Sequence, residues 1–445
     1  MRIVGAPAVA SLMKEVGLEG LRTAVAAPLD DRAREQYLHW DKLRHLDPPP
    51  GLTSKLWWLK IKLARSDEWR RLPLSDRNGL ALGFTLPDLV LRSLHRIDQY
   101  GGGIAATQDG LTSERAARRR IVVNSLMEEA IRSSQLEGAS TSRAVAKELL
   151  RSNREPLDRG ERMIANNYRA IQFMREEMGR ELRPDSILEL HRIVTAGTLD
   201  DPGAAGRLQT PGEERVKVHD RAGGVVWLPP PAEQLPERLR LLCAFANAGD
   251  EKEPFVHPVL RAILLHLWLA YDHPFVDGNG RTARILFSWA MSARGYWFAE
   301  HLPISRLIRQ AHGQYSQAFL EVERDGGDTT YFLLQQLGVI ERAIDDFDAY
   351  VERKAVEQRD VKRLLHDVEG INGRQLVLLT HALKHPDHVY TFAGHARSNR
   401  VTHETARGDL GGLVERGLLV RRRHGRRYAF EPVPELAARL KESSA

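Results

Sequence analysis

The sequence predicts a mainly α-helical protein of several domains, with a small β-hairpin in its central domain and a two-stranded wing near its carboxy terminus. At 445 residues the chain is too long for one compact core, so two or three domains are expected. Apolar residues recur at helical spacing in most segments. The β-like runs are short and form two pairs, each joined by a turn-forming segment.

The composition is that of a globular protein rather than a disordered one. Apolar residues make up 42% of the chain and charged residues 28%. The most apolar run, Val259 to Tyr271, is too short to cross a bilayer, and Lys14 and Glu15 interrupt the only mildly apolar opening. Cys243 is the single cysteine and cannot form an internal disulfide, which fits a reducing compartment. We therefore expect a cytoplasmic protein with no membrane partner.

Positive charge is concentrated near the carboxy terminus. Residues 371–445 contain 13 Lys and Arg against 7 Asp and Glu, and this surplus of six equals the +6 of the whole chain. A basic partner-binding module joined to a near-neutral body has this distribution. The predicted divisions are a helical accessory region at 1–112, a core at 113–345, a helical linker at 346–370, a winged domain at 371–432 and a tail at 433–445.

The accessory region is expected to be helical, and it contains no motif that assigns it a role. Its helix-like stretches are broken by Pro48–Pro50 and by Gly101–Gly103. Four aromatic residues give it enough mass for a small packed unit: Trp40, Trp57, Trp58 and Trp69.

The core is expected to consist of helices around one hairpin. A helical pattern fills most of Ser113–Leu150, and further helices are predicted at Arg159–Met178, Pro184–Ala196, Ala232–Ala246, Pro258–Tyr271 and Arg281–Gly295, with a charged helix pair at Thr329–Asp367. Two β-like runs, Arg215–Val218 and Val225–Leu228, flank a turn that contains two glycines and predict a hairpin.

One segment between two predicted helices concentrates chemically useful residues, and it reads His273-Pro274-Phe275-Val276-Asp277-Gly278-Asn279-Gly280-Arg281-Thr282-Ala283-Arg284. Gly278 and Gly280 permit unusual backbone angles. With the exposed N–H groups of the following helix start, they can form a concave anion-binding nest. Arg281 and Arg284 are three residues apart, so they share one face of the first helical turn and suit a polyphosphate.

Two further residues of this segment complete a reactive set. Asp277 offers the hard oxygen ligand that Mg²⁺ requires beside phosphate oxygens. His273 is the one side chain in the segment that can take a proton near neutral pH. Each feature alone is common in a turn between helices. The ordered set instead predicts a site that holds Mg-nucleotide and activates a hydroxyl.

The segment matches the Fic motif, His-x-Phe-x-Asp/Glu-Gly-Asn-Gly-Arg-x-x-Arg, without departure, and the chain resembles Fic proteins from about Ser113 to Asp345. The resemblance implies a mainly helical Fic core with a small β-hairpin flap over the site. It also implies transfer of AMP from ATP to a Ser, Thr or Tyr hydroxyl of a target protein, which can be the chain itself. His273 would be the general base and Asp277 would hold Mg²⁺. The phosphates would be bound by Gly278, Asn279, Gly280, Arg281 and Arg284.

The predicted hairpin resembles the flap with which Fic proteins pair an extended stretch of their target. Such pairing uses backbone hydrogen bonds, which fix the position of the target stretch whatever its sequence. The alternative is a purely structural hairpin. The residues of the flap are Arg215, Val216, Lys217, Val218, Val225, Val226, Trp227 and Leu228.

A short upstream segment resembles the Fic inhibitory motif, Ser/Thr-x-x-x-Glu-Gly/Asn. Ser133 and Glu137 are one helical turn apart, and Gly138 can end the helix, which lies within about residues 120–138. In Fic proteins this glutamate pairs with the second arginine of the motif, here Arg284. One guanidinium cannot serve a carboxylate and a phosphate in the same geometry. The resemblance therefore implies autoinhibition by Glu137.

The basic carboxy-terminal segment resembles a winged helix-turn-helix domain. Three helices are expected at Gly373–His385, Phe392–Asn399 and Thr402–Arg416, followed by β-like runs at Leu418–Arg422 and Arg427–Phe430. DNA phosphates are candidate partners for a set of basic residues, which are Arg400, His403, Arg407, Arg421, Arg422, Arg423, Arg426 and Arg427. A docking or dimerisation module is the competing interpretation, so a homodimer stays open.

Two other functions remain beside AMP transfer. Some Fic relatives transfer UMP, phosphate or phosphocholine, and some remove AMP. Asp277 and the intact arginine pair favour a triphosphate donor. From a different class, the chain would be a DNA-binding regulator whose Fic site senses nucleotide or modifies the chain itself.

Overall fold

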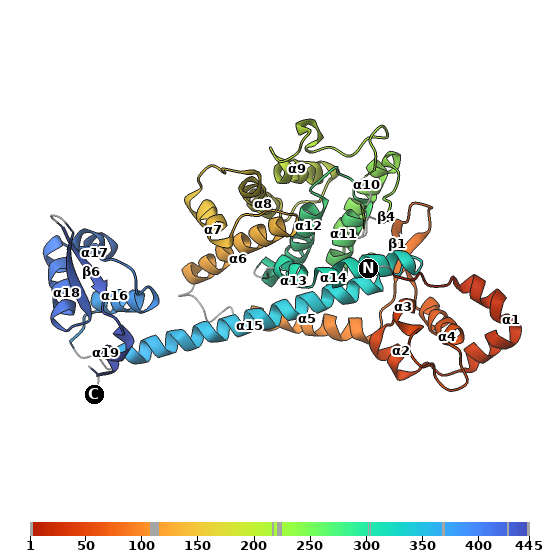
Figure 1. The fold of residues 1–445 in the computed structure, drawn as a ribbon, viewed down its shortest axis with the longest axis horizontal. Coiled ribbons are helices and arrows are strands. Elements are labelled where there is room, and N and C mark those ends of the chain that lie inside the picture. Colours follow the sequence, from red (N-terminus) through yellow and green to blue (C-terminus); the bar gives the residue numbers. More distant parts are fainter. Residues whose placement is uncertain are drawn as a thin grey trace. The chain divides into compact units, whose positions relative to one another are not determined.

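The structure is a computed structural model that describes residues 3–106, 115–215, 218–219, 225–300, 302, 304–366, 370–424 and 427–442. It divides into two compact units, Met1–Asp345 and Asp346–Ala445. Helices dominate both units, and the strands of the described residues form three separate two-stranded antiparallel sheets (Figure 1). The predicted mainly α fold is confirmed.

The first unit begins with the accessory region, which packs around buried tryptophans. Trp57 and Trp58 are almost completely buried in a cluster that also contains Leu12 and Leu43. Its elements are α1 (Val9–Ala26), α2 (Asp31–Gln36), α3 (Trp40–Leu43), α4 (Ser54–Asp67), β1 (Arg70–Ser75), β2 (Ala81–Phe84) and α5 (Asp88–Ala106).

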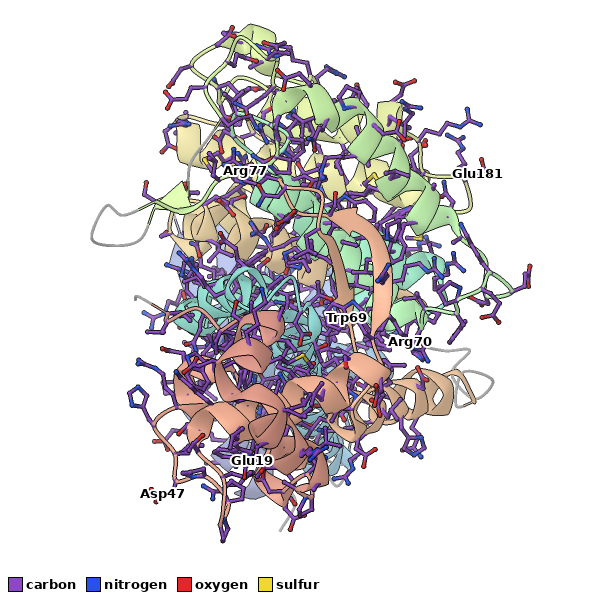
Figure 2. All side chains as sticks on the ribbon, turned by 90° about the vertical axis from the view of Figure 1, so that its right-hand side faces the viewer. Glu19, Asp47, Trp69, Arg70, Arg77 and Glu181 are labelled. Carbon is purple, nitrogen blue, oxygen red and sulfur yellow. The ribbon has the colours of Figure 1, made fainter. Side chains whose placement is uncertain are left out.

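The hairpin β1–β2 was not predicted. Asp76 accepts the backbone N–H groups of Asn78 and Leu80, both at 2.8 Å, and thereby closes the turn. The Asn78-Gly79 pair is itself a hairpin signal that could have revealed the turn. In Figure 2 the hairpin rises from the accessory helices, with Trp69 and Arg70 at its base and Arg77 at its turn.

The accessory region is fixed to the end of the core. Gly83 in β2 accepts the N–H of Thr329 at 2.8 Å and donates its own N–H to Gly327 at 3.1 Å. Lys62 forms an ion pair of 3.0 Å with the buried Asp325. These contacts explain why residues 1–345 form one unit.

The core of the first unit surrounds α11, whose residues are nearly all buried. Its helices are α6 (Arg115–Leu136), α7 (Arg143–Ser152), α8 (Arg159–Glu176), α9 (Pro184–Thr195), η2 (Pro202–Ala204), η3 (Ala232–Gln234), α10 (Leu235–Asn247), α11 (Pro258–Asp272), α12 (Asn279–Ala293), η4 (Trp297–Glu300), α13 (Ile304–Gln310), α14 (His312–Arg324) and the part of α15 (Thr330–His366) up to Asp345. The predicted helix pair at 329–367 is wrong, since α15 is one helix. Gly338 is its only glycine and it contains no proline, so nothing in the segment breaks it.

The second unit contains three helices followed by a two-stranded hairpin, an order consistent with the expected winged helix-turn-helix. Thr402 caps the third helix through the N–H of Thr405, as predicted. The segment expected to be a tail carries a helix, because Leu436 and Leu440 pack into the core of this unit. The elements are α16 (Gly373–Lys384), α17 (Phe392–Asn399), α18 (His403–Glu415), β5 (Leu419–His424), β6 (Arg427–Pro432) and α19 (Leu436–Glu442).

Candidate active site

The twelve-residue segment forms a tight turn between α11 and α12. His273 ends α11 in a left-handed conformation, with φ 46° and ψ 54°, and donates its N–H to Leu269 at 3.0 Å. Gly278, with φ 83°, is the N-cap of α12, which begins at Asn279 and so starts two residues earlier than predicted. The N–H groups of its first turn have no partner within the helix and can bind an anion.

Buried side chains hold the turn in shape. Asn279 accepts the N–H of Phe275 at 3.0 Å and donates to its carbonyl at 2.8 Å. Phe275 stacks on His191, with ring centroids 3.8 Å apart. The Asn279 amide is therefore occupied within the turn, and the backbone of this residue is what remains for an anion.

His191 is a functional candidate that the sequence analysis treated only as part of a helix. Its Nδ1 accepts the N–H of Gly206 at 3.0 Å, so its Nε2 carries the proton and donates to the carbonyl of Asp277 at 2.9 Å. Burial lowers the pKa of His191 to about 4, which keeps the ring neutral. The only sequence signal was a polar residue within an apolar helix.

Both glycines of the turn have close neighbours. A Cβ at Gly278 would lie 2.8 Å from the Thr195 methyl group, and one at Gly280 would lie 2.2 Å from the Glu137 carboxylate. The carboxylate of Glu137 thus occupies space directly against the first turn of α12, where an anion would bind.

The first motif arginine is buried with unused donors. The side chain of Arg281 is 0% exposed, and its Nη1 donates to the carbonyl of Val194 at 3.0 Å. Its Nε and Nη2 find no hydrogen-bond acceptor among the described residues, although Nη2 lies 3.7 Å from the Asp277 carboxylate. A buried guanidinium with two unsatisfied donors is costly unless a ligand satisfies them.

The second motif arginine binds residues in the last turn of α6 and directly after it. Arg284 donates from Nη2 to the Glu137 carboxylate at 2.8 Å and to the Ser133 carbonyl at 3.1 Å, and from Nε to the Ser133 hydroxyl at 2.9 Å. Gly138 follows the helix with φ 96°. The structure therefore brings Ser133 and Glu137 to Arg284, from which they are 151 and 147 positions away in the sequence.

Asp277 stands at the open side of the turn. Its side chain is 43% exposed, and its Oδ2 lies 3.7 Å from both Arg281 and Arg159. The described residues contain no group of three His, Cys, Asp or Glu side chains that could hold a metal ion. One exposed carboxylate suits a Mg²⁺ ion that arrives with phosphate oxygens, because Mg²⁺ usually keeps few protein ligands. The donor set fits this ion.

The candidate base is held neutral. Burial is the main cause that lowers the pKa of His273 below its ordinary value of 6.5. A neutral imidazole can accept a proton at pH 7, as a general base must.

The flap is partly described. Val216 and Lys217 lie outside the described residues, while β3 (Val218–His219) pairs antiparallel with β4 (Val225–Trp227), which also includes Val226. Arg215 does not extend toward a target, because its guanidinium donates to the carbonyls of Pro230 at 2.8 Å and Asp272 at 2.6 Å. It also bonds the Gln209 side chain. Arg215 therefore holds the base of the flap against the catalytic turn.

In the second unit, the candidate DNA contacts are mostly exposed. Three of them are exposed at the end of α17 and in α18, namely Arg400, His403 and Arg407. Three more are exposed along β5, namely Arg421, Arg422 and Arg423. Arg422 donates to Glu431 at 2.7 Å, which reduces its availability. Arg426 lies outside the described residues, and for Arg427 the structure describes only the backbone. No helix among the described residues is long and apolar enough to cross a membrane.

Comparisons with known proteins found a family match over a segment that contains residues 273–284. Residues 181–291 match the Fic/DOC family. "Protein adenylyltransferase fic-1" of Caenorhabditis elegans is 36% identical over 116 residues, which cover 26% of this chain and 20% of that protein. "Protein adenylyltransferase Fic" of Nematostella vectensis is 32% identical over 164 residues, which cover 37% of this chain and 33% of that protein. The matches thus span a third or less of these relatives.

The fold comparison covers more of the chain. The crystal structure of a Fic family protein from Desulfovibrio desulfuricans G20 aligns over 81% of this chain and 99% of that chain. The TM-score is 0.53 and the sequence identity is 16%, so the likeness is one of fold.

Proposed function

The chain is a Fic-domain protein, and from this premise we propose that it transfers AMP from ATP to a Ser, Thr or Tyr hydroxyl of a target protein. One observation carries the proposal. The buried Arg281, in the first turn of α12, has two donors, Nε and Nη2, that find no hydrogen-bond acceptor among the described residues. A polyphosphate supplies the acceptors that this guanidinium lacks.

His273 is the proposed general base. The neutral imidazole removes the proton of the attacking hydroxyl, whose oxygen forms a bond to the α-phosphorus of ATP. The bond from that phosphorus to the oxygen bridging the α- and β-phosphates breaks, and pyrophosphate leaves. Backbone N–H groups of Asn279 and Gly280 stabilise the negative charge that develops on the phosphoryl oxygens, while the N–H of Gly278 donates to Oδ1 of Asp277.

The arginines and Asp277 orient the donor. Arg281 binds phosphate through the donors that have no protein partner, and Arg284 binds the outer phosphate once it is released from Glu137. Asp277 is the residue that would hold Mg²⁺, which neutralises phosphate charge when bound.

Glu137 is the proposed brake. Its carboxylate binds Arg284 and fills the space beside Gly280. A phosphate therefore cannot bind Arg284 at this place while the carboxylate is there. The hairpin β3–β4 is the proposed docking strand for the target, which pairs by β-strand addition. The single buried Cys243 supports a reducing, cytoplasmic location.

Incubation of the Glu137→Gly variant with Mg·ATP, followed by mass spectrometry, tests the transferred group. We expect a 5′-AMP adduct on the chain or on lysate proteins. If the corresponding donors give an adduct of UMP or phosphate and ATP gives no AMP adduct, transfer of one of these other groups is favoured. Loss of a pre-existing AMP group would indicate the reverse reaction.

For the second unit we propose DNA binding, which the exposed Arg407 of α18 and the exposed arginines of β5 support. A gel shift with genomic fragments at two salt concentrations tests it, because contacts to phosphate must weaken with salt. If no shift is seen and sedimentation shows that the chain forms a dimer, the competing role as a dimerisation module is favoured.

A further inference from the structure

Asp272, the residue before the candidate base, is buried and fully engaged. It is 4% exposed. Its Oδ1 accepts two hydrogen bonds from Arg238, from Nε at 2.9 Å and from Nη2 at 2.6 Å, and its Oδ2 accepts the indole N–H of Trp268 at 3.0 Å. Arg238 is 6% exposed, so the ion pair is shielded from water. This carboxylate has no part in the transfer chemistry described above.

The peptide that joins Asp272 to His273 is fixed on both sides. Its carbonyl accepts Nη2 of Arg215 at 2.6 Å, and its N–H donates to the carbonyl of Leu269 at 3.0 Å. In addition, the N–H of Gln209 donates to the carbonyl of Pro274 at 2.9 Å. Arg215 and Gln209 therefore bind the backbone immediately before and immediately after His273.

The backbone of His273 needs this support. Its φ of 46° lies in the left-handed region, which a residue with a Cβ adopts at a cost in energy. Such a conformation persists only where the surroundings determine it. The side chain of Asp272 and the carbonyl beside it supply two of these constraints directly next to the strained residue.

The same network reaches the accessory region. Arg238 donates from Nη2 to the carbonyl of Ser75 at 2.6 Å and lies 3.3 Å from the Ser75 hydroxyl through Nη1. Ser75 is the last residue of β1, so one arginine connects the accessory hairpin to the residue before the base. The accessory region, for which the sequence suggested no role, is thus linked through Arg238 to the residue before the candidate base.

We infer that Asp272 is a positioning residue, which together with Arg238 and Trp268 holds His273 in the orientation needed for proton removal, with the accessory hairpin β1–β2 as the support behind Arg238. This inference rests on the proposed function and adds a residue to it. A misplacement of a catalytic group by about 1 Å can lower a rate by about 100-fold. The effect belongs to the chemical step, because none of these side chains contacts the phosphate-binding arginines.

The test uses the full chain with the Glu137→Gly change as parent, and it measures AMP incorporation from [α-³²P]ATP and the binding of Mg·ATP by calorimetry. For Asp272→Asn we expect a rate about 10- to 100-fold below the parent at saturating ATP, with ATP affinity unchanged within about threefold. Trp268→Phe keeps an aromatic ring in the core and removes only the indole N–H that binds Asp272. Its rate should therefore lie between that of the parent and that of Asp272→Asn. Asp325→Asn is the matched control, because Asp325 is also buried and ion-paired but contacts Lys62, Arg65 and Tyr331 instead.

Parental rates in Asp272→Asn, or a loss matched by Asp325→Asn at equal melting temperature, would overturn the inference. If Asp272→Asn does not fold, a parental rate in Trp268→Phe overturns it equally. His273→Ala separates this failure from that of the proposed function. A silent His273→Ala with a fully active Asp272→Asn removes the inference alone, whereas an unlabelled parent or an active His273→Ala removes both.

Discussion

Two arginine-rich regions of this chain, the catalytic turn at 273–284 and the hairpin β5–β6, hold their guanidinium groups in different ways. Arg281 and Arg284 are buried, and fixed protein contacts orient both. Along β5 the arginines are exposed, and the side chain of Arg422 points to a neighbouring glutamate at the surface.

This difference teaches what each region can do. Buried, oriented charges are arranged before the ligand arrives, as catalysis requires. Exposed charges on flexible side chains suit a partner that supplies its own shape, such as a nucleic acid backbone. Single changes in the turn should therefore have large effects, and single changes in the wing should have small ones that depend on salt.

Replacement of the candidate base should have the largest effect. In the Glu137→Gly background, we expect His273→Ala to lower AMP transfer by about 10²- to 10⁴-fold, since a positioned base contributes this much. Labelling with [α-³²P]ATP measures it. His45→Ala, a change at an exposed histidine of the accessory region, is the control and should keep the parental rate. Equal labelling by both variants would contradict the role of His273.

Release of the brake should have the next largest effect, in the opposite direction. A hydrogen bond to a charged group contributes about 1.5–3 kcal/mol, so Glu137→Gly should raise transfer by about 10- to 100-fold. Ser133→Ala removes one neutral hydroxyl acceptor from Arg284 and should raise it only a few-fold. Initial rates at fixed Mg·ATP compare the two. A larger increase for Ser133→Ala than for Glu137→Gly would contradict the proposed inhibition.

Substitutions in the second unit should have smaller effects that change with salt. If Arg407 contacts a phosphate, Arg407→Ser should reduce the slope of log affinity against log salt concentration by about 1. Arg422→Ser is the matched control, because Arg422 is already paired with Glu431 and should change the slope less. Fluorescence anisotropy with duplex DNA at several salt concentrations measures both. Identical slopes for both variants and the parent would show that these arginines do not bind phosphate.

The smallest effect concerns pH. A general base acts only when unprotonated, and burial lowers the pKa of His273 below 6.5. The rate of transfer at saturating ATP should therefore fall to half of its plateau only below pH 6.5. A profile measured on the Glu137→Gly variant checks this. A midpoint above 6.5 on the acid side would contradict a buried, neutral base.

The catalytic turn could be predicted from sequence because its residues are adjacent in the chain. Spacing alone placed Asp277, Gly278 and Arg281 at one loop-to-helix junction, and the structure confirms that junction. The contact between Glu137 and Arg284 spans 147 positions and came only from the resemblance to Fic proteins.

The supporting contacts could not be predicted in this way. The bonds from His191 to Asp277 and from Arg238 to Asp272 join segments that no local pattern places side by side. The hairpin β1–β2 was not predicted, although the turn residues Asn78-Gly79 are a hairpin signal.

The central claim is that Mg·ATP binds at the first turn of α12 once Glu137 is gone. Isothermal titration calorimetry of the Glu137→Gly variant, with and without Arg281→Gln, tests it most directly. We predict one binding site in the single variant, and about 10- to 100-fold weaker binding when Arg281 no longer offers its charged donors. No measurable heat in the single variant, or equal affinity in both, would contradict the claim.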